Sequence, residues 1–130
     1  MNKIIKYKTE NGYCPIDNFI KELIRDGCDK DVEKIKTYVR LLEVSGEMII
    51  KNENWAKKLN SKIYELRPKR NRILYFVFSN NEFVLLHGFK KKTQKTPINE
   101  INKALNEASD YERRYENGEK VWSFRRYWIN

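Results

Sequence analysis

The sequence predicts a single α+β domain in which helices pack against a small antiparallel sheet. Three observations lead to this prediction. The chain has 130 residues, a length that suits one hydrophobic core. Two amphipathic helical segments precede a run of strands, and a third helical segment follows it. Aromatic residues make up 13% of the sequence, which indicates a packed domain rather than a disordered basic tail. The predicted order is β-α-α-β-β-β-α.

The first part of the chain predicts one strand and two helices. The strand covers residues 3–8, where apolar side chains lie among lysines. Pro15 suits the first turn of a helix, because its missing N–H costs nothing there. A second helix, capped by Asp29 or Asp31, ends near Gly46. Apolar residues recur at helical spacing in both segments, so we expect a helical hairpin that covers the sheet. These residues are Phe19, Ile20, Leu23, Ile24, Val32, Ile35, Val39 and Leu42.

Three strands follow, at residues 62–67, 72–78 and 83–89. The short connections between them predict an antiparallel meander. The turn at residues 79–82 contains two asparagines, which tolerate positive φ. In the first of these strands Glu65 shares a face with Arg67, because side chains alternate along a strand.

A last helix is predicted to begin at Thr96-Pro97 and to end at Gly118. Its expected apolar face consists of Ile98, Ile101, Leu105, Ala108 and Tyr111. We therefore predict a folded domain over residues 1–118, followed by an aromatic and basic tail over residues 119–130. Packing of this tail on its own domain is the favoured interpretation, and docking to a partner is the alternative.

The basic residues are concentrated in one part of the chain. The stretch from Lys57 to Lys95 contains eleven basic and two acidic side chains, so it accounts for the whole formal charge of +9. Because this stretch also contains the three strands, it predicts a basic face on a sheet. Such a face is typical of a surface that binds a phosphate backbone.

Several classes of protein are disfavoured. The cysteines Cys14 and Cys28 form no CxxC motif, and His87 is the only histidine, so no structural zinc site is assembled. We expect neither a metal nor a cofactor. The N-terminal residues do not resemble a signal peptide, and no apolar run reaches the roughly 20 residues of a membrane span. We expect a cytoplasmic protein that does not contact membranes.

Two basic segments are candidates for chemistry. In the first, Arg67 and Arg72 flank a tight turn, and a guanidinium can hold two phosphate oxygens at once. The alternative for Arg67 is a salt bridge to Glu65. For Lys69 and Arg70 the favoured interpretation is an ordinary solvated hairpin tip.

The second segment runs from His87 to Pro97 and leads into a helix N-terminus, which favours anions. A solvated loop is the alternative. Neighbouring lysines disfavour a charged imidazole, so His87 is a candidate general base. The alternative is a core histidine with a satisfied hydrogen bond. Crowding of Lys90, Lys91 and Lys92 makes a neutral lysine the other candidate base.

Two long motifs, YELRPKRNRILYFVF and FVLLHGFKKKTQKTP, resemble the phage-derived branch of the RelE/HigB toxins of bacterial toxin–antitoxin systems. The segments YKTENGYCPIDNFIKEL and DYERR resemble the same branch, and the resemblance covers about residues 5–114. It implies the RelE-like microbial ribonuclease fold. It also implies cleavage of mRNA in the ribosomal A site without a metal, and a HigA-like antitoxin with a helix-turn-helix domain.

The resemblance also assigns residues. Arg72 matches the arginine that contacts the scissile phosphate, and Arg67 matches the basic end of the preceding strand. Lys91, with Lys92 as the other candidate, matches the basic residue after the last strand, and His87 lies in the LLHGF motif of the branch. Where many relatives have a base-stacking tyrosine, this chain has Thr96-Pro97. The residues expected to bind RNA around this site are Lys57, Lys58, Tyr64, Lys69, Arg70, Lys90 and Lys95.

The function implied by the resemblance is that of a type II toxin that cleaves mRNA by attack of the 2′-hydroxyl on the adjacent phosphorus. Two other classes remain open. The related ParE toxins share the fold but inhibit DNA gyrase, and a plain nucleic-acid-binding domain could use the same basic face without catalysis.

Overall fold

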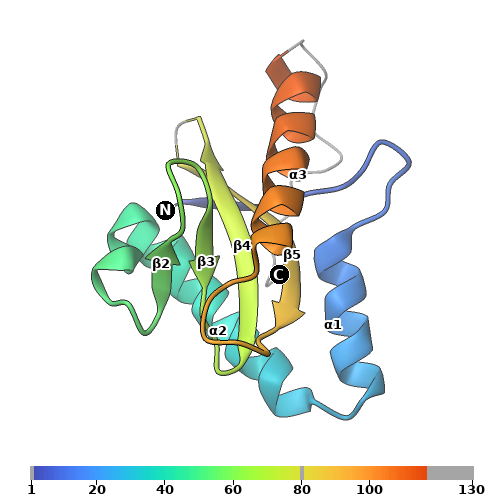
Figure 1. Ribbon diagram of the computed structural model, residues 1–130, viewed down its shortest axis with the longest axis vertical. Coiled ribbons are helices and arrows are strands. Elements are labelled where there is room, and N and C mark those ends of the chain that lie inside the picture. The colour runs from blue at the N-terminus through green and yellow to red at the C-terminus, as the bar shows by residue number, and fades with distance from the viewer. Residues whose placement is uncertain (1, 80, 117–130) are drawn as a thin grey trace.

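A five-stranded sheet separates two helical layers (Figure 1). The computed structural model describes residues 2–79 and 81–116. Helices α1 and α2 cover one face of the sheet, and α3 covers part of the other. The elements in chain order are β1 (Lys3–Lys6), α1 (Pro15–Arg25), α2 (Asp29–Ser45), the 3₁₀ helix η1 (Gly46–Lys51), β2 (Ala56–Lys58), β3 (Tyr64–Leu66), β4 (Asn71–Phe78), β5 (Glu82–Lys90) and α3 (Ile98–Glu116).

The α+β class is confirmed, and every predicted element is present. The strand order is β1-β5-β4-β3-β2. Strands β2 to β5 form the expected antiparallel meander, but β1 pairs in parallel with β5. The prediction of an antiparallel sheet is therefore wrong for β1, and the sheet is mixed. Two short elements, η1 and β2, were not predicted, because β2 has only three residues and shows no alternation of apolar side chains.

The predicted cap of the second helix is also wrong. Cys28 occupies the N-cap of α2, and its side chain makes no capping hydrogen bond. Asp29 and Asp31 instead lie in the first turn, where their negative charge interacts favourably with the helix dipole. Gly46 follows the helix with φ of 58°, a conformation that glycine adopts without a steric penalty.

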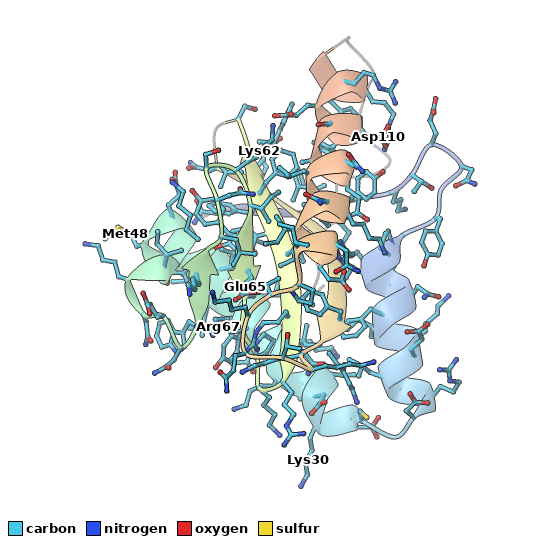
Figure 2. The ribbon with its side chains drawn as sticks, in the orientation of Figure 1. Lys30, Met48, Lys62, Glu65, Arg67 and Asp110 are labelled. Carbon is cyan, nitrogen blue, oxygen red and sulfur yellow. The ribbon has the colours of Figure 1, made fainter. Side chains whose placement is uncertain are left out.

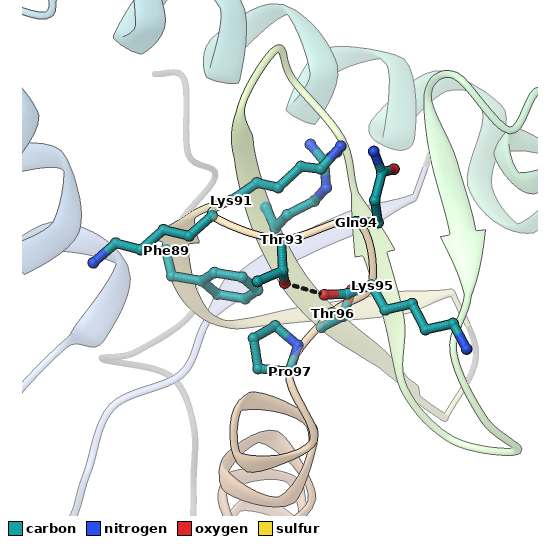
Figure 3. Close-up of a pocket in the computed structure, with 9 residues that line it drawn as sticks. Phe89, Lys91, Thr93, Gln94, Lys95, Thr96 and Pro97 are labelled. Atoms are coloured by element: carbon teal, nitrogen blue, oxygen red, sulfur yellow. Dashed lines mark hydrogen bonds between the residues drawn. The ribbon is translucent and has the colours of Figure 1, made fainter.

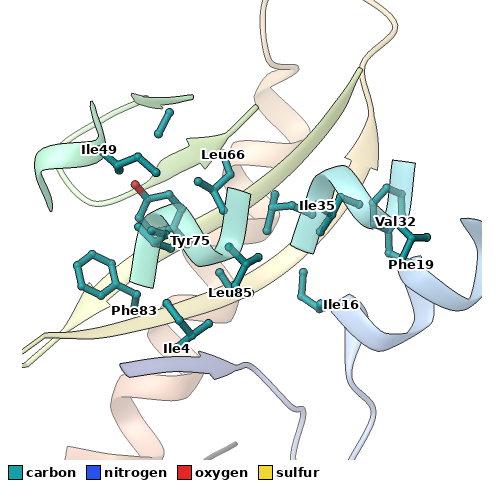
Figure 4. Packing of buried hydrophobic residues seen from close by; sticks show 14 of the residues in the cluster. Ile4, Ile16, Phe19, Val32, Ile35, Ile49, Leu66, Tyr75, Phe83 and Leu85 are labelled. Atoms are coloured by element: carbon teal, nitrogen blue, oxygen red, sulfur yellow. The ribbon is translucent and has the colours of Figure 1, made fainter. Parts of the chain in front are cut away.

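The layer formed by α1 and α2 holds the larger core cluster (Figure 4). Phe19 and Ile35 pack from the helices against Leu66, Tyr75 and their neighbours on the strands. Gly88 of β5 permits this close approach, because a Cβ there would lie 2.6 Å from the ring of Phe19.

On the opposite face, α3 packs through small residues. Ala104 and Ala108 are fully buried, and Tyr111 contacts Phe76 and Phe78 edge to face at centroid distances of 6.0 and 5.1 Å. The predicted face of this helix is partly wrong. Ile98 is 69% exposed, because the first turn of α3 projects beyond the apolar part of the sheet, whereas Ala104 was not predicted to be buried.

Three further observations concern the limits of the described chain. The predicted helix end at Gly118 and the tail over residues 119–130 lie outside the described residues. The predicted turn before β5 is present, with Asn81 at φ of 66° and the amide of Glu82 donating to the carbonyl of Ser79. None of the helices in the described part of the chain has the length and apolarity required to cross a membrane.

Candidate functional site

A β-bulge in β5 determines which of its side chains face α3. Leu74 of β4 pairs with His87, and the next residue, Tyr75, pairs with Leu85, so Leu86 has no partner in the register. A single extra residue reverses the facing of every later side chain in the strand. His87 is thereby turned toward α3, and Phe89, two residues later, lies on the same face.

Arg72 is held rigidly near the start of β4, opposite Phe89. Its residue is 6% exposed, and its Nη1 donates to the carbonyls of Lys69 and Asn71 at 2.9 and 2.8 Å. Burial lowers the pKa of Arg72, and the nearby carboxylate of Glu65 acts in the opposite direction. The guanidinium nevertheless stays charged at neutral pH. Its Nη2 donates no hydrogen bond to any described residue, so that edge is available to a ligand.

Glu65 is the residue that organises this end of the sheet, and the sequence showed it only as a possible partner of Arg67. It is 2% exposed in the middle of β3. Its Oε2 lies 3.5 Å from Nε of Arg67 and 3.9 Å from Nε of Arg72, and its Oε1 accepts a 2.6 Å hydrogen bond from the hydroxyl of Thr96. Glu65 pairs with Leu74 in the register, which makes Arg72 its diagonal neighbour. Only the strand register could have revealed this contact.

Arg67 lies beside this carboxylate and is more open than Arg72. Its Nη1 donates to the carbonyl of Glu53 at 2.8 Å, and its side chain is 24% exposed. The salt bridge to Glu65 that the sequence suggested as an alternative is present. It does not compete with an anion-binding role, because one carboxylate faces two guanidinium groups (Figure 2 labels Glu65 and Arg67).

The loop between β5 and α3 folds over Arg72 and forms a small pocket (Figure 3). The amide of Lys91 donates to the carbonyl of Arg70 at 2.6 Å, which fixes the start of the loop against the β3–β4 turn. The hydroxyl of Thr93 donates to the carbonyl of Lys95 at 2.6 Å. The enclosed space is about 10 Å³, enough for about one water molecule, so a larger anion would meet the rim. The lining residues are Arg72, Phe89, Lys91, Lys92, Thr93, Gln94, Lys95, Thr96 and Pro97.

His87 does not lie among lysines, and the premise for its role as a general base is wrong. The residue is 3% exposed, with Nδ1 2.6 Å from Glu107 Oε1 and Nε2 2.9 Å from Glu100 Oε1. Both glutamates belong to α3. The bulge at Leu86 is the physical reason, because it turns His87 toward this helix. The geometry matches the alternative interpretation of a core histidine with satisfied ring nitrogens.

The register separates the residues expected to bind RNA into two groups. Lys57 pairs with Glu65 and therefore lies on the face that carries Arg72. Lys58 pairs with Tyr64, whose ring stacks on that of Tyr75 at 5.3 Å in the core beneath α2. The expectation that Lys58 and Tyr64 adjoin the site is thus wrong, since they occupy the opposite face of the sheet.

The other expected RNA-binding residues lie at the end of the sheet. Lys69 and Arg70 form the exposed β3–β4 turn, and Lys95 lies on the pocket rim. Lys90 points to the α1–α2 side, where its Nζ is 3.6 Å from Sγ of Cys28. Nothing in the described residues groups three His, Cys, Asp or Glu side chains in a way that could hold a metal ion.

The whole site falls within a region shared with other proteins. The sequence profile of the family described as Phage derived protein Gp49-like (DUF891) matches residues 24–109, well over half of the 130-residue chain. The chain belongs to this family. Gp49-like proteins are toxin-like and related to RelE and HigB, so the coarse part of the resemblance is confirmed. Among curated proteins, none matches the chain.

Proposed function

We propose that this Gp49-like protein is the toxin of a type II toxin–antitoxin system and an endoribonuclease that cleaves mRNA on the ribosome. The observation that carries the proposal is the setting of Arg72. Its guanidinium is buried and fixed on two sides, by carbonyl groups at Nη1 and by Glu65 near Nε, while Nη2 stays available at a pocket rimmed by lysines. A cation held in this way is preorganised for an anion and loses little freedom on binding.

The proposed reaction is attack of the RNA 2′-hydroxyl oxygen on the adjacent phosphorus, with departure of the 5′-oxygen. Negative charge grows on the phosphorane oxygens, and one preorganised donor typically contributes about 10²–10³ in rate. Arg72 supplies the central donor, and Arg67 and Lys91 add to the positive field. Lys91 and Lys92 carry protons at the rim of the pocket and would protonate the departing oxygen. His87 takes no part, because both ring nitrogens contact glutamates.

The test compares two arginine variants of equal charge change. Arg72→Ala is expected to lower translation-dependent cleavage by about 10²–10³ while the fold persists. Arg25→Ala removes an exposed arginine on α1 and should leave cleavage unchanged. Cleaved transcripts are mapped at their 5′ ends after induction of the chain alone, and the upstream products should end in a 2′,3′-cyclic phosphate or its opened form.

Retained cleavage by folded Arg72→Ala would reject the assignment of the site. A free 3′-hydroxyl on the upstream product would reject 2′-hydroxyl attack. Inhibition of DNA supercoiling by purified gyrase, with no cleaved RNA, would place the protein with the ParE toxins instead. We further propose a helix-turn-helix antitoxin as the cellular partner, to be identified by co-purification with the product of the adjacent gene.

A further inference from the structure

A second, larger hollow adjoins the Arg72 pocket. It lies between the β3–β4 turn, the end of β5 and the start of α2, and its volume is about 550 Å³. We call it the lysine groove. Five of its lining residues are cationic and only Asp31 is acidic; the cations are Lys69, Arg70, Lys90, Lys91 and Lys92.

The cations of the lysine groove are not neutralised by the protein. Among the ion pairs of the described residues, none involves any of the five. Like charges gathered in one hollow repel each other, so a bound polyanion would relieve that repulsion. The groove is also held in shape, because the amide of Lys91 donates to the carbonyl of Arg70. Lys69 has φ of 58°, which is uncommon outside glycine and costs on the order of 1 kcal/mol.

The lysine groove and the Arg72 pocket are continuous. Lys91 and Lys92 line both hollows, so the groove begins where the pocket ends. The groove then passes around the end of β5, because Lys90 lies on the α1–α2 side of the sheet. An extended anion bound at Arg72 therefore has a cationic path that leads away from the pocket.

We infer that the lysine groove binds the sugar–phosphate backbone of single-stranded RNA next to the cleaved phosphate. This inference rests on the proposed ribonuclease function. A single strand is favoured over a duplex because in-line attack requires the 2′-oxygen, the phosphorus and the 5′-oxygen to align, and base-paired A-form geometry does not allow this. The strand that enters the groove is the continuation of the strand in the pocket.

The experiment compares two triple variants with the same change in charge. The groove variant is Lys69→Gln/Arg70→Gln/Lys90→Gln, which leaves Lys91 and Lys92 in place. The control is Lys21→Gln/Lys51→Gln/Lys103→Gln, three exposed lysines that line none of the hollows at the site. Binding is measured by fluorescence anisotropy with a 12-nucleotide single-stranded RNA carrying 2′-O-methyl groups, a 12-base-pair RNA duplex, and a 2′-O-methyl dinucleotide.

The groove variant is expected to bind the 12-nucleotide strand on the order of 10²-fold more weakly at 0.1 M salt, because each lost phosphate contact reduces the salt slope by about 0.7. Its slope should fall by about 2, and its affinity for the dinucleotide should match wild type. The control should retain nearly all affinity for the longer strand.

Equal losses in the two triple variants would overturn the inference, because net charge alone would then explain the effect. A loss confined to the duplex would also overturn it and would assign the groove to double-stranded RNA. If the groove variant matches wild type while wild type cleaves RNA, the groove assignment fails and the ribonuclease proposal stands. If wild type neither binds nor cleaves RNA, the ribonuclease proposal fails as well.

Discussion

The face of the sheet that carries α3 has two ends that differ in chemistry. At one end Phe76 meets Ala108 and Tyr111, and the helix seals an apolar interface. At the other end the same strands present Glu65 and Arg72, and a loop replaces the helix as the cover. Figure 2 shows this separation, with Glu65 far from Asp110 near the C-terminal part of α3.

The difference indicates how one small sheet combines stability with a charged site. Apolar burial contributes roughly 25 cal/mol per Å² of surface removed from water, so the helical end stabilises the fold. Burial of charges costs free energy unless the charges are paired and hydrogen-bonded. At the loop end, Glu65 offsets much of the cost of holding Arg67 and Arg72 near each other. We therefore expect substitutions at the helical end to change stability, and those at the loop end to change activity as well.

The largest expected effect on stability is that of Phe76→Ala. The ring is 1% exposed and lies against Tyr111, so its removal leaves a cavity and should cost about 3–5 kcal/mol. Urea unfolding followed by circular dichroism measures this loss. Phe78→Ala, at a partly exposed ring, is the matched control and should cost less. A Phe76→Ala cost below about 1 kcal/mol would contradict the assignment of stability to the helical end.

Glu65→Gln should lower both stability and cleavage. Two guanidinium groups would lose their common counter-charge, and breaking a buried ion pair costs about 3–5 kcal/mol, a figure that the long contacts of 3.5 and 3.9 Å place at its lower end. The double variant Glu65→Gln/Arg72→Met should regain most of the stability but no cleavage. If Glu65→Gln alone is as stable and active as wild type, Glu65 is not the organising residue.

Thr96→Val tests how the loop is tied to the sheet. It removes the 2.6 Å hydrogen bond to the carboxylate of Glu65 and should cost about 1–3 kcal/mol, because a buried charged acceptor loses a donor. Thr93→Val, which removes an exposed hydroxyl, should stay within about 0.5 kcal/mol of wild type. Denaturant midpoints compare the two, and equal values would show that the Thr96 contact does not secure the loop.

The smallest expected effect is a pH dependence at the helical end. Burial by itself would raise the pKa of Asp110, but hydrogen bonds from Tyr7 and Arg114 outweigh burial and lower the pKa below 3.8. A depressed carboxyl pKa stabilises the fold above the unfolded pKa, and this contribution is lost as pH falls through the folded value. Asp110→Asn should therefore lower stability at neutral pH and flatten its decline below about pH 4. An unchanged acid limb in thermal unfolding would contradict this.

The local elements could be read from the sequence because their signals are local. The spacing of Phe19 and Leu23 gives a helix whatever lies beside it, and the apolar run in β4 gives a strand. Arg72 could be found because it lies beside a turn within a motif that resembles known toxins. Glu65, His87 and Tyr64 could not be placed correctly, because their neighbours come from other strands and from α3.

The sequence by itself determined the α+β class, the main helices and strands, and the concentration of positive charge between Lys57 and Lys95. These depend on periodicity and composition, which contacts within a few residues establish. The tertiary structure alone decided the parallel entry of β1, the bulge at Leu86 that turns His87 toward α3, and the register that sets Glu65 beside Arg72. A shift of one residue reverses the face of a strand, and pairing between distant segments fixes that shift.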